Sequence, residues 1–264
     1  MSTAAKQLRF IGEYVRANLA MAMEYRANFI IQVIGMVLND ALWVFFWWLF
    51  FRQFPLVAGW SYQELLLLYA VLTLGFGLGV GVMGNCTRLS QIIAEGHLDF
   101  YLTLPKNVLL HVLVSRMQVS ALGDIAFGLL VYGFSGAVSW ANTAMLLMTS
   151  MLTAVTFVAF AVLAHSLTFY IGNASALASQ LFEALLTFSS YPGGIFKGLT
   201  RFLMFTVIPA GFISYAPVAI MGERKLEFVL AMGGFTLALA LLASTVFYRG
   251  LRRYESGSLI SVRL

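Results

Sequence analysis

The chain has 264 residues, of which 61% are apolar and only 10% are charged, and its formal net charge is +5. Soluble domains carry about 25% charged residues, so this composition excludes a protein that faces water on every side. Because a helix needs about 20 apolar residues to cross a bilayer, the length predicts an all-α integral membrane protein with about six spans.

Residues 1–26 are predicted to form an amphipathic helix that lies in the membrane interface and does not cross it. Leu8, Ile11, Val15 and Leu19 recur at helical spacing, while most charged residues fall on the other face. This pattern is typical of interfacial helices, and an ordinary packed amphipathic helix is the alternative. Charged residues precede the first apolar run, so no cleavable signal peptide is expected.

Apolar runs then predict six transmembrane helices within a membrane domain that covers residues 27–248. They span residues 27–51, 62–84, 108–134, 143–171, 176–196 and 226–248.

The segment 197–222, before the last span, is apolar but interrupted by Pro209, Pro217 and several glycines. Irregular backbone at membrane depth must be shielded by protein, so this segment is predicted to be a re-entrant pair of short helices. Residues 249–264 follow the last span and are predicted to be a basic cytoplasmic tail.

Basic residues are distributed unequally between the two sides of the predicted spans. With six spans, both termini and the 85–107 loop share one side, and this side holds the larger share of lysine and arginine. The positive-inside rule therefore predicts that the termini and this loop are cytoplasmic. The residues on that side are Lys6, Arg9, Arg16, Arg26, Arg88, Lys106, Arg249, Arg252, Arg253 and Arg263.

The second predicted span contains the sequence GFGLGVG, with glycines at Gly75, Gly77, Gly79 and Gly81. A phosphate-binding loop would need a strand before it and a helix after it, and no GxxxxGK[ST] motif occurs in the chain. The glycines instead form two small-xxx-small pairs, which allow membrane helices to approach closely. We therefore expect them to pack helices, and we expect no P-loop ATPase site in this chain.

Three acidic residues, Asp40, Asp124 and Glu183, fall inside predicted spans. A charged residue at a helix centre costs about 2.5–3.5 kcal/mol on insertion scales, so each one requires an explanation. They are candidates for a translocation path or a subunit contact. The alternative is that they lie near helix ends or pair internally with polar neighbours. Asp40 lies nearest the middle of its span and is the strongest candidate.

The sequence contains no recognisable catalytic or metal-binding constellation. His97, His111 and His165 are scattered, and neither an HExxH motif nor a paired His/Cys spacing occurs. An intramembrane transferase would need a cluster of acids or histidines at one interface. We therefore predict no catalytic residue and no metal site.

A polar island, residues 88–105, interrupts the apolar pattern between the second and third spans, and we call it the knob. Leu89, Ile92 and Ile93 form a short apolar stripe after its first residue. Gly96 is placed to end this first helix in the left-handed conformation.

A second brief amphipathic helix is predicted over residues 97–104, before Pro105 stops it. Its apolar face would hold Leu98, Tyr101 and Leu102. Two helical pieces that meet at a glycine make a rigid unit, whereas a tight cytoplasmic turn, the alternative, needs only a few polar residues. We therefore interpret the knob as a docking surface for a partner.

Three motifs resemble the permease subunits of ABC-2 type transporters, in particular the bacterial group with a separately encoded ATPase. Together these motifs extend over nearly the whole chain. They are Tyr25-Arg26-Ala27-Asn28-Phe29 at the first span, Gly96-x-Leu98-Asp99-x-x-Leu102-x-x-Pro105 in the knob, and, around the fifth span and the re-entrant segment, Tyr191-Pro192, Ile195-Phe196-x-Gly198, Ile208-Pro209 and Ile213-Ser214-Tyr215-x-Pro217.

This resemblance implies the ABC-2, or type V exporter-like, fold: an amphipathic N-terminal helix, six spans, a re-entrant pair before the last span and cytoplasmic termini in the bacterial inner membrane. It also implies that two permease chains, identical or paralogous, pair in the lipid bilayer. Each chain would rest on an ABC ATPase subunit that binds ATP and Mg²⁺, so this chain itself is expected to bind no cofactor and no nucleic acid.

By the same resemblance, the knob is the coupling helix that inserts into the ATPase, and Glu95 departs from the basic or small polar residue expected before its glycine. The residues assigned to coupling are Arg88, Glu95, Gly96, His97, Leu98, Asp99, Leu102 and Pro105. The few intramembrane charges favour export of an amphipathic or lipid-like substrate over a small ion. The alternative is a non-transporting scaffold or a channel-like subunit, which would have no ATPase partner.

Overall fold

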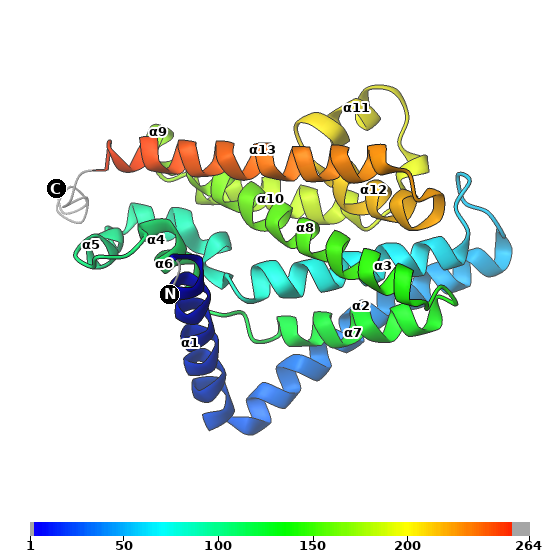
Figure 1. The fold of residues 1–264 in the computed structure, drawn as a ribbon, viewed down its shortest axis with the longest axis horizontal. Helices are drawn as coiled ribbons and strands as arrows, with labels where there is room; N and C mark the ends of the chain where they lie inside the picture. Colours follow the sequence, from blue (N-terminus) through cyan, green and yellow to red (C-terminus); the bar gives the residue numbers. More distant parts are fainter. Residues whose placement is uncertain (1–2, 255–264) are drawn as a thin grey trace.

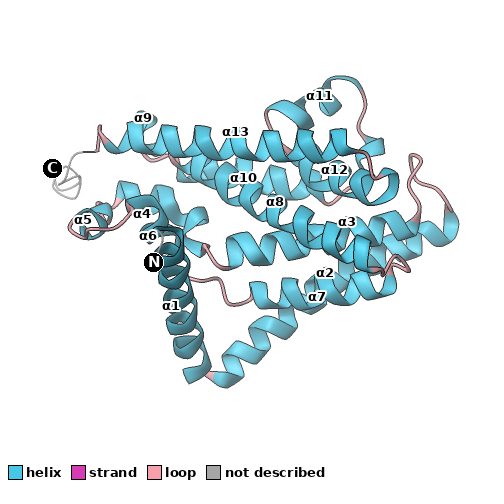
Figure 2. Cartoon of the chain, viewed as in Figure 1, coloured by secondary structure: helices cyan, strands magenta, loops and turns pink. Residues whose placement is uncertain are grey.

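The computed structural model describes residues 3–254, and this part of the chain consists of helices and connecting loops without a strand (Figure 2). The N-terminal helix α1 (Thr3–Glu24) runs across the long axis of the molecule, whereas the main helices of the bundle run along it (Figure 1). These are α2 (Arg26–Gln53), α3 (Tyr62–Phe76), α7 (Ala121–Phe134), α8 (Trp140–His165), α10 (Ser175–Ser189) and α13 (Leu226–Leu251).

The remaining helices continue or connect these. They are η1 (Gly77–Gly81), η2 (Gly84–Arg88), α4 (Leu89–Ala94), α5 (Leu98–Leu102), α6 (Val108–Val114), α9 (Thr168–Ile171), η3 (Gly193–Ile195), α11 (Gly198–Thr206) and α12 (Ala210–Glu223). The longest of them, α12, packs against α3, α8 and α13.

Within the described residues, four helical stretches are long and apolar enough to cross a membrane. They are α2, α3 continued to Gly81, α8 continued to Ile171, and α13. The bent pair α11 and α12 adds a fifth if it is counted as one span. An all-helical, multi-pass membrane protein is therefore confirmed, whereas the count of six spans stays a prediction.

The predicted span 108–134 is not one helix, because the chain breaks between α6 and α7. Two backbone N–H groups in the break find partners elsewhere: that of Met117 donates to Asn18 Oδ1 at 3.2 Å, and that of Gln118 donates to the carbonyl of Gly81 at 2.8 Å. Interrupted backbone in a membrane must be satisfied by other groups, and these bonds meet that requirement. The predicted span 176–196 is also shorter, because α10 ends at Ser189.

The predicted re-entrant segment contains the two helices α11 and α12, which meet at an angle of 91°. Pro209 stands at the bend as the residue that precedes α12, and Pro217 lies inside α12. Since proline cannot donate a backbone hydrogen bond, it favours helix starts and bends. Whether this pair enters the membrane and returns stays a prediction.

The glycines of α3 and η1 face two different neighbours. A Cβ atom at Gly79 would lie 2.6 Å from the carbonyl oxygen of Ala154 in α8, and one at Gly75 would collide with Thr153 of the same helix. Gly77 and Gly81 instead face α7. Each small-xxx-small pair thus allows one helix to approach closely.

Helices α2 and α3 differ sharply in burial although both are apolar. In the most apolar part of α3, 83% of the residues are buried, whereas in the most apolar part of α2 only 6% are buried. Helix α3 therefore forms the centre of the bundle, while α2 presents most of its surface outward.

The start of α1, the knob and the end of α13 gather at one end of the bundle, while the loop 135–139 and helix α11 lie at the other (Figure 1). This arrangement places the start of α1, the end of α13 and the knob at one end of the bundle, and the distribution of basic residues predicts a shared side for these segments. Of the predicted tail 249–264, residues 255–264 lie outside the described residues.

Candidate functional site

The knob consists of α4 and α5, joined by a turn at Gly96. This glycine has φ +76°, a left-handed conformation that a side chain with a Cβ atom adopts only at a cost. Leu89 and Leu98, one on each helix, are fully buried and attach both pieces to the body of the protein. Arg88 and Pro105, at the two ends of the knob, are exposed.

Buried polar bonds anchor the knob and the turn before it. The hydroxyl of Ser90 lies 2.7 Å from Nδ1 of His165, at the end of α8. Asn85 donates to Oγ of Ser115 at 2.9 Å, and the Tyr101 hydroxyl lies 2.9 Å from the same oxygen. These bonds tie the knob to the end of α6 and to α8, although Nε2 of His165 has no partner among the described residues.

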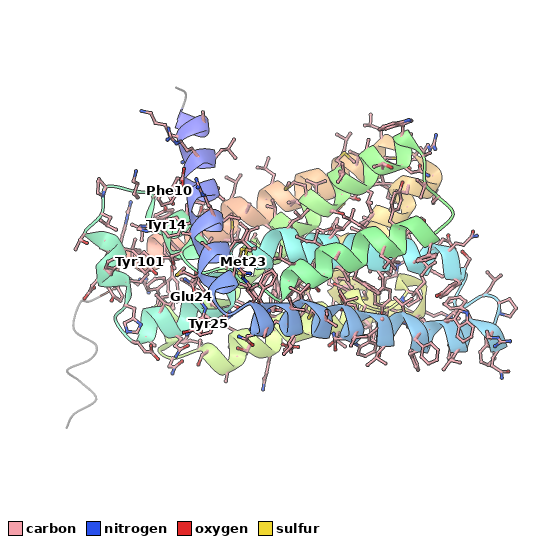
Figure 3. All side chains as sticks on the ribbon, turned by 90° about the horizontal axis from the view of Figure 1, so that it is seen from below. Phe10, Tyr14, Met23, Glu24, Tyr25 and Tyr101 are labelled. Atoms are coloured by element: carbon pink, nitrogen blue, oxygen red, sulfur yellow. The ribbon has the colours of Figure 1, made fainter. Side chains whose placement is uncertain are left out.

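Helix α1 packs against the same region from the outside. Figure 3 shows Phe10 and Tyr14 of α1 together with Tyr101 of the knob. The Tyr14 hydroxyl lies 2.7 Å from Nε2 of His111, and the ring centroids of Tyr101 and His111 are 5.0 Å apart. Nζ of Lys106 lies 5.5 Å from the ring centroid of Phe10. Burial raises the pKa of Tyr14, so this hydroxyl stays protonated and can donate to the histidine.

The tip of the knob exposes apolar side chains. Phe100 is 65% exposed, and Leu102 and Leu104 are also exposed. The sequence predicted Leu98 and Leu102 on one apolar face, but the structure separates them: Leu98 is buried in the core and Leu102 faces outward. The difference gives the knob an inner apolar side that anchors it and an outer one that is uncovered.

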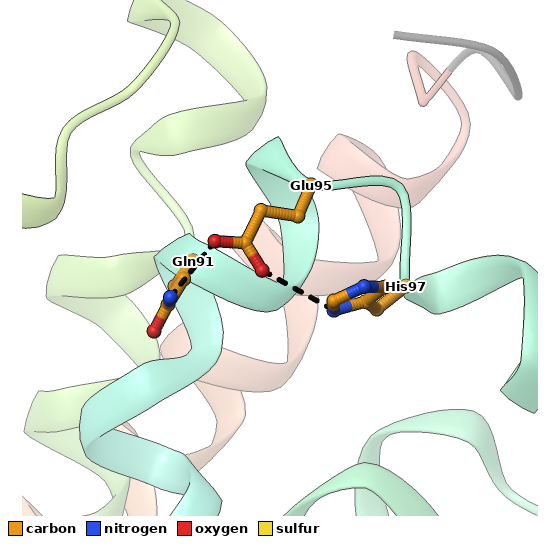
Figure 4. Close-up of polar contacts among 3 residues, drawn as sticks. All are labelled: Gln91, Glu95 and His97. Carbon is orange, nitrogen blue, oxygen red and sulfur yellow. Dashed lines mark hydrogen bonds and ion pairs between the residues drawn. The ribbon is translucent and has the colours of Figure 1, made fainter. Parts of the chain in front are cut away.

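Polar residues surround the turn at Gly96. Gln91 donates to Oε1 of Glu95 at 2.8 Å, and Oε2 of Glu95 lies 3.3 Å from Nδ1 of His97 (Figure 4). On the other side of the turn, Asp99 lies close to Tyr254 after α13. Burial, together with this carboxylate, raises the pKa of Tyr254 to about 12.

A second candidate site lies inside the bundle, away from the knob. Asp40 of α2, Asp124 of α7 and Glu183 of α10 line one cavity of about 290 Å³, which we call the acidic cavity. Asp40 and Asp124 are buried, with Asp124 only 3% exposed, whereas Glu183 is exposed. The structure thus brings together three acids that the sequence could identify only one by one.

The two buried carboxyl groups line the same cavity and influence each other electrostatically. Asn39 donates to Oδ1 of Asp40 at 3.5 Å, which is a long bond, and the Oδ2 atoms of both aspartates have no partner among the described residues. The ion pairs within residues 3–254, His97 with Glu95 and Lys225 with Glu223, involve none of the cavity acids.

Aromatic and hydroxyl side chains complete the wall of the acidic cavity. Tyr69 accepts a hydrogen bond from Nε1 of Trp47 at 3.1 Å and donates to the carbonyl of Ser190 at 3.2 Å, so it ties α2, α3 and the end of α10 together. Trp43 and Tyr191 also line the cavity.

The other residues singled out in the re-entrant region lie apart from the acidic cavity. Pro192 precedes η3, and Tyr215 of α12 packs under the guanidinium of Arg201, which is 5.9 Å from its ring centroid. Sequence reasoning missed the contacts of Ser90 with His165 and of Tyr14 with His111. In the sequence these residues appear only as single polar positions, and such a position does not reveal which residue it contacts.

Comparison with known proteins gives one match. Residues 37–258 match the family model described as ABC-2 family transporter protein, which covers most of the chain. No curated protein and no solved structure matches.

Proposed function

The chain belongs to the ABC-2 transporter family, and we propose that it is the permease subunit of an ATP-driven exporter whose separate ATPase docks on the knob. Membership makes it a transmembrane component of an ABC transporter. ATP and Mg²⁺ would then be bound by the partner, and this chain would supply the membrane path.

The shape of the knob is the single observation that carries the coupling part of this proposal. It is a rigid unit fixed by Leu98 and by the bond between Ser90 and His165, and it presents Phe100 and Leu102 outward. Exposed apolar groups on a fixed support are typical of docking sites for a partner. A flexible loop would not transmit a displacement.

A displacement of the knob would reach the membrane domain along two routes. One follows the chain backwards through η2 and η1 into α3, whose glycines contact α7 and α8. The other passes from Ser90 to His165 at the end of α8. Since packed helices move as rigid bodies between discrete arrangements, closure of the ATPases would tilt these helices together.

The remaining parts of the proposal concern the membrane and the second subunit. We place the protein in the bacterial inner membrane with six spans, a re-entrant α11–α12 pair and cytoplasmic termini. A second permease chain would pack in the bilayer beside the first, and the outward face of α2 supports such a contact. The cargo would be an amphipathic or lipid-like molecule.

The first experiment is affinity purification of the tagged chain in mild detergent, with mass spectrometry of the proteins that co-elute. A stoichiometric P-loop ATPase is the expected result, and the presence or absence of a second permease distinguishes a homodimer from a heterodimer. A folded, monodisperse chain without an ATPase would contradict the proposal and favour a scaffold or channel-like subunit.

Two glycine variants then test the coupling role. Gly96 and Gly136 have φ +76° and φ +71° and lie at opposite ends of the bundle, so leucine strains both by about 1–2 kcal/mol. Gly96→Leu should lower permease-dependent ATPase activity at least tenfold, while Gly136→Leu should leave it unchanged. Equal activities in both variants would contradict the coupling role.

A further inference from the structure

The acidic cavity is lined by three acidic side chains and, among the described residues of its wall, by no cation. Asp40, Asp124 and Glu183 come from three helices, and the cavity lining includes no lysine, arginine or histidine. Ionisable residues inside a membrane domain pair with one another, bind backbone groups or mark a pathway. Within residues 3–254, Asn39 donates a long bond to one oxygen of Asp40, and a backbone N–H interacts with the Asp124 carboxyl group.

Two carboxyl groups that share one site repel each other when both are ionised. The pair of Asp40 and Asp124 therefore needs a positive group, or a proton, between its unpartnered Oδ2 atoms. The other titratable groups that face the pair are Glu183 on α10, Tyr69 on α3 and Tyr191 after α10, and none of them is a cation. No side chain in the described lining of the cavity supplies this group.

The chemistry of the lining identifies the kind of cation. Within the described residues no group of three His, Cys, Asp or Glu side chains is close enough to hold a metal ion. Instead, the aromatic rings of Trp43, Phe76 and Tyr191 line the same space, and such rings attract organic cations. The volume of about 290 Å³ suits a small head group and not a whole lipid.

We propose that the acidic cavity binds a primary ammonium group. Its N–H donors would satisfy the Oδ2 atoms of Asp40 and Asp124, as an ammonium with three donors can do. Glu183, exposed on the same cavity, would attract the cation to the site. This inference names the chemical class of the cargo and so rests on the proposed function, but binding needs no ATPase and is measured separately.

The binding test uses the purified permease in phosphatidylcholine nanodiscs and titrates it with phenethylamine, following the quenching of tryptophan fluorescence. The neutral 2-phenylethanol, of the same shape, is the control ligand. Asp40→Asn and Asp124→Asn should each weaken phenethylamine binding at least tenfold. Glu227→Gln, which alters an exposed acid outside the cavity, should bind as the unaltered protein does.

Glu183→Gln guards against a failure to fold, because this residue is exposed and removes no core contact. It should weaken binding about threefold, since it alters attraction over a distance and leaves the donor contacts intact. Equal binding of the amine and the alcohol, or normal amine binding in both aspartate variants, would overturn the proposal. In that case the carboxyl pair holds a proton.

Native mass spectrometry separates two sources of the ammonium group. Retention of phosphatidylethanolamine by the unaltered protein but not by Asp124→Asn identifies a lipid head group. Binding of phenethylamine without lipid retention identifies a soluble amine. Either result supports the site, and the absence of both overturns it. An amine site in a chain that co-purifies without an ATPase would refute the proposed function alone.

Discussion

The knob and the acidic cavity differ in the bonds that their buried polar side chains make with the rest of the protein. At the knob, Ser90 bonds His165 and Asn85 bonds Ser115 at normal hydrogen-bond lengths. In the cavity, both Asp40 and Asp124 keep an unpartnered buried oxygen. The first region is held in one geometry, whereas the second keeps groups whose partners must come from elsewhere.

This difference separates a part that transmits force from a part that binds. Hydrogen bonds between packed elements stabilise one conformation, which a coupling element needs. Unpaired buried polar groups cost free energy, and such costs are tolerated at functional sites. Helix α3 connects the two regions, because it lines the cavity with Tyr69 and continues through η1 and η2 into the knob.

The largest effect on stability is expected from a change in α3, the helix that connects the two regions. Gly79→Val would place a side chain against the backbone of Ala154 and should destabilise the protein by about 3 kcal/mol. Thermal unfolding of the purified protein measures this. Gly35→Val in α2 is the matched control, because nothing lies within 4 Å of its Cβ position. Equal melting temperatures for the two variants would refute close packing by α3.

A smaller effect of opposite sign is expected in the cavity. Asp124→Asn should stabilise the amine-free protein by about 1.5 kcal/mol, because the new amide can donate to Asp40 and removes one of two facing carboxyl groups. The same thermal measurement checks this, with Glu227→Gln as the neutral control. A lower melting temperature for Asp124→Asn would show that the carboxylate already has a stabilising partner.

A change at the knob should lower the stability of the protein. Ser90→Ala removes the hydroxyl that bonds Nδ1 of His165 and leaves this nitrogen only the longer backbone bond from residue 90, at 3.4 Å, at a cost of about 1 kcal/mol. It should also reduce permease-dependent ATPase activity. Ser175→Ala, whose hydroxyl bonds Asn173 at the surface, should change neither quantity. Unchanged stability and activity in Ser90→Ala would mean that α8 does not anchor the knob.

The smallest change tests whether α1 supports the knob. Tyr14→Phe removes the hydroxyl that contacts His111 and should cost about 0.5–1 kcal/mol. Hydrogen exchange of residues 3–24 should become faster. Tyr25→Phe alters a tyrosine that is exposed and serves as the control. Identical exchange in both variants would indicate that α1 is held by other contacts.

Local features of the sequence predicted much of the knob and of the α3 packing. The glycine at 96, the stripe around Leu89 and the glycine pairs of the second span all act through neighbours close in sequence. The sequence could not predict that Asp40, Asp124 and Glu183 line one cavity, because that depends on how three distant helices pack. It also missed the break before α7, whose backbone is satisfied by Asn18, 99 residues away.

The central claim is that the ATPase docks on the knob, and site-specific photo-crosslinking tests it most directly. A benzophenone side chain would replace Phe100, which is 65% exposed at the tip of the knob, or Trp140, which is 94% exposed at the opposite end of the bundle. We predict a crosslink to a P-loop ATPase from position 100 and none from position 140. No crosslink from position 100, or equal crosslinking from both positions, would contradict the account.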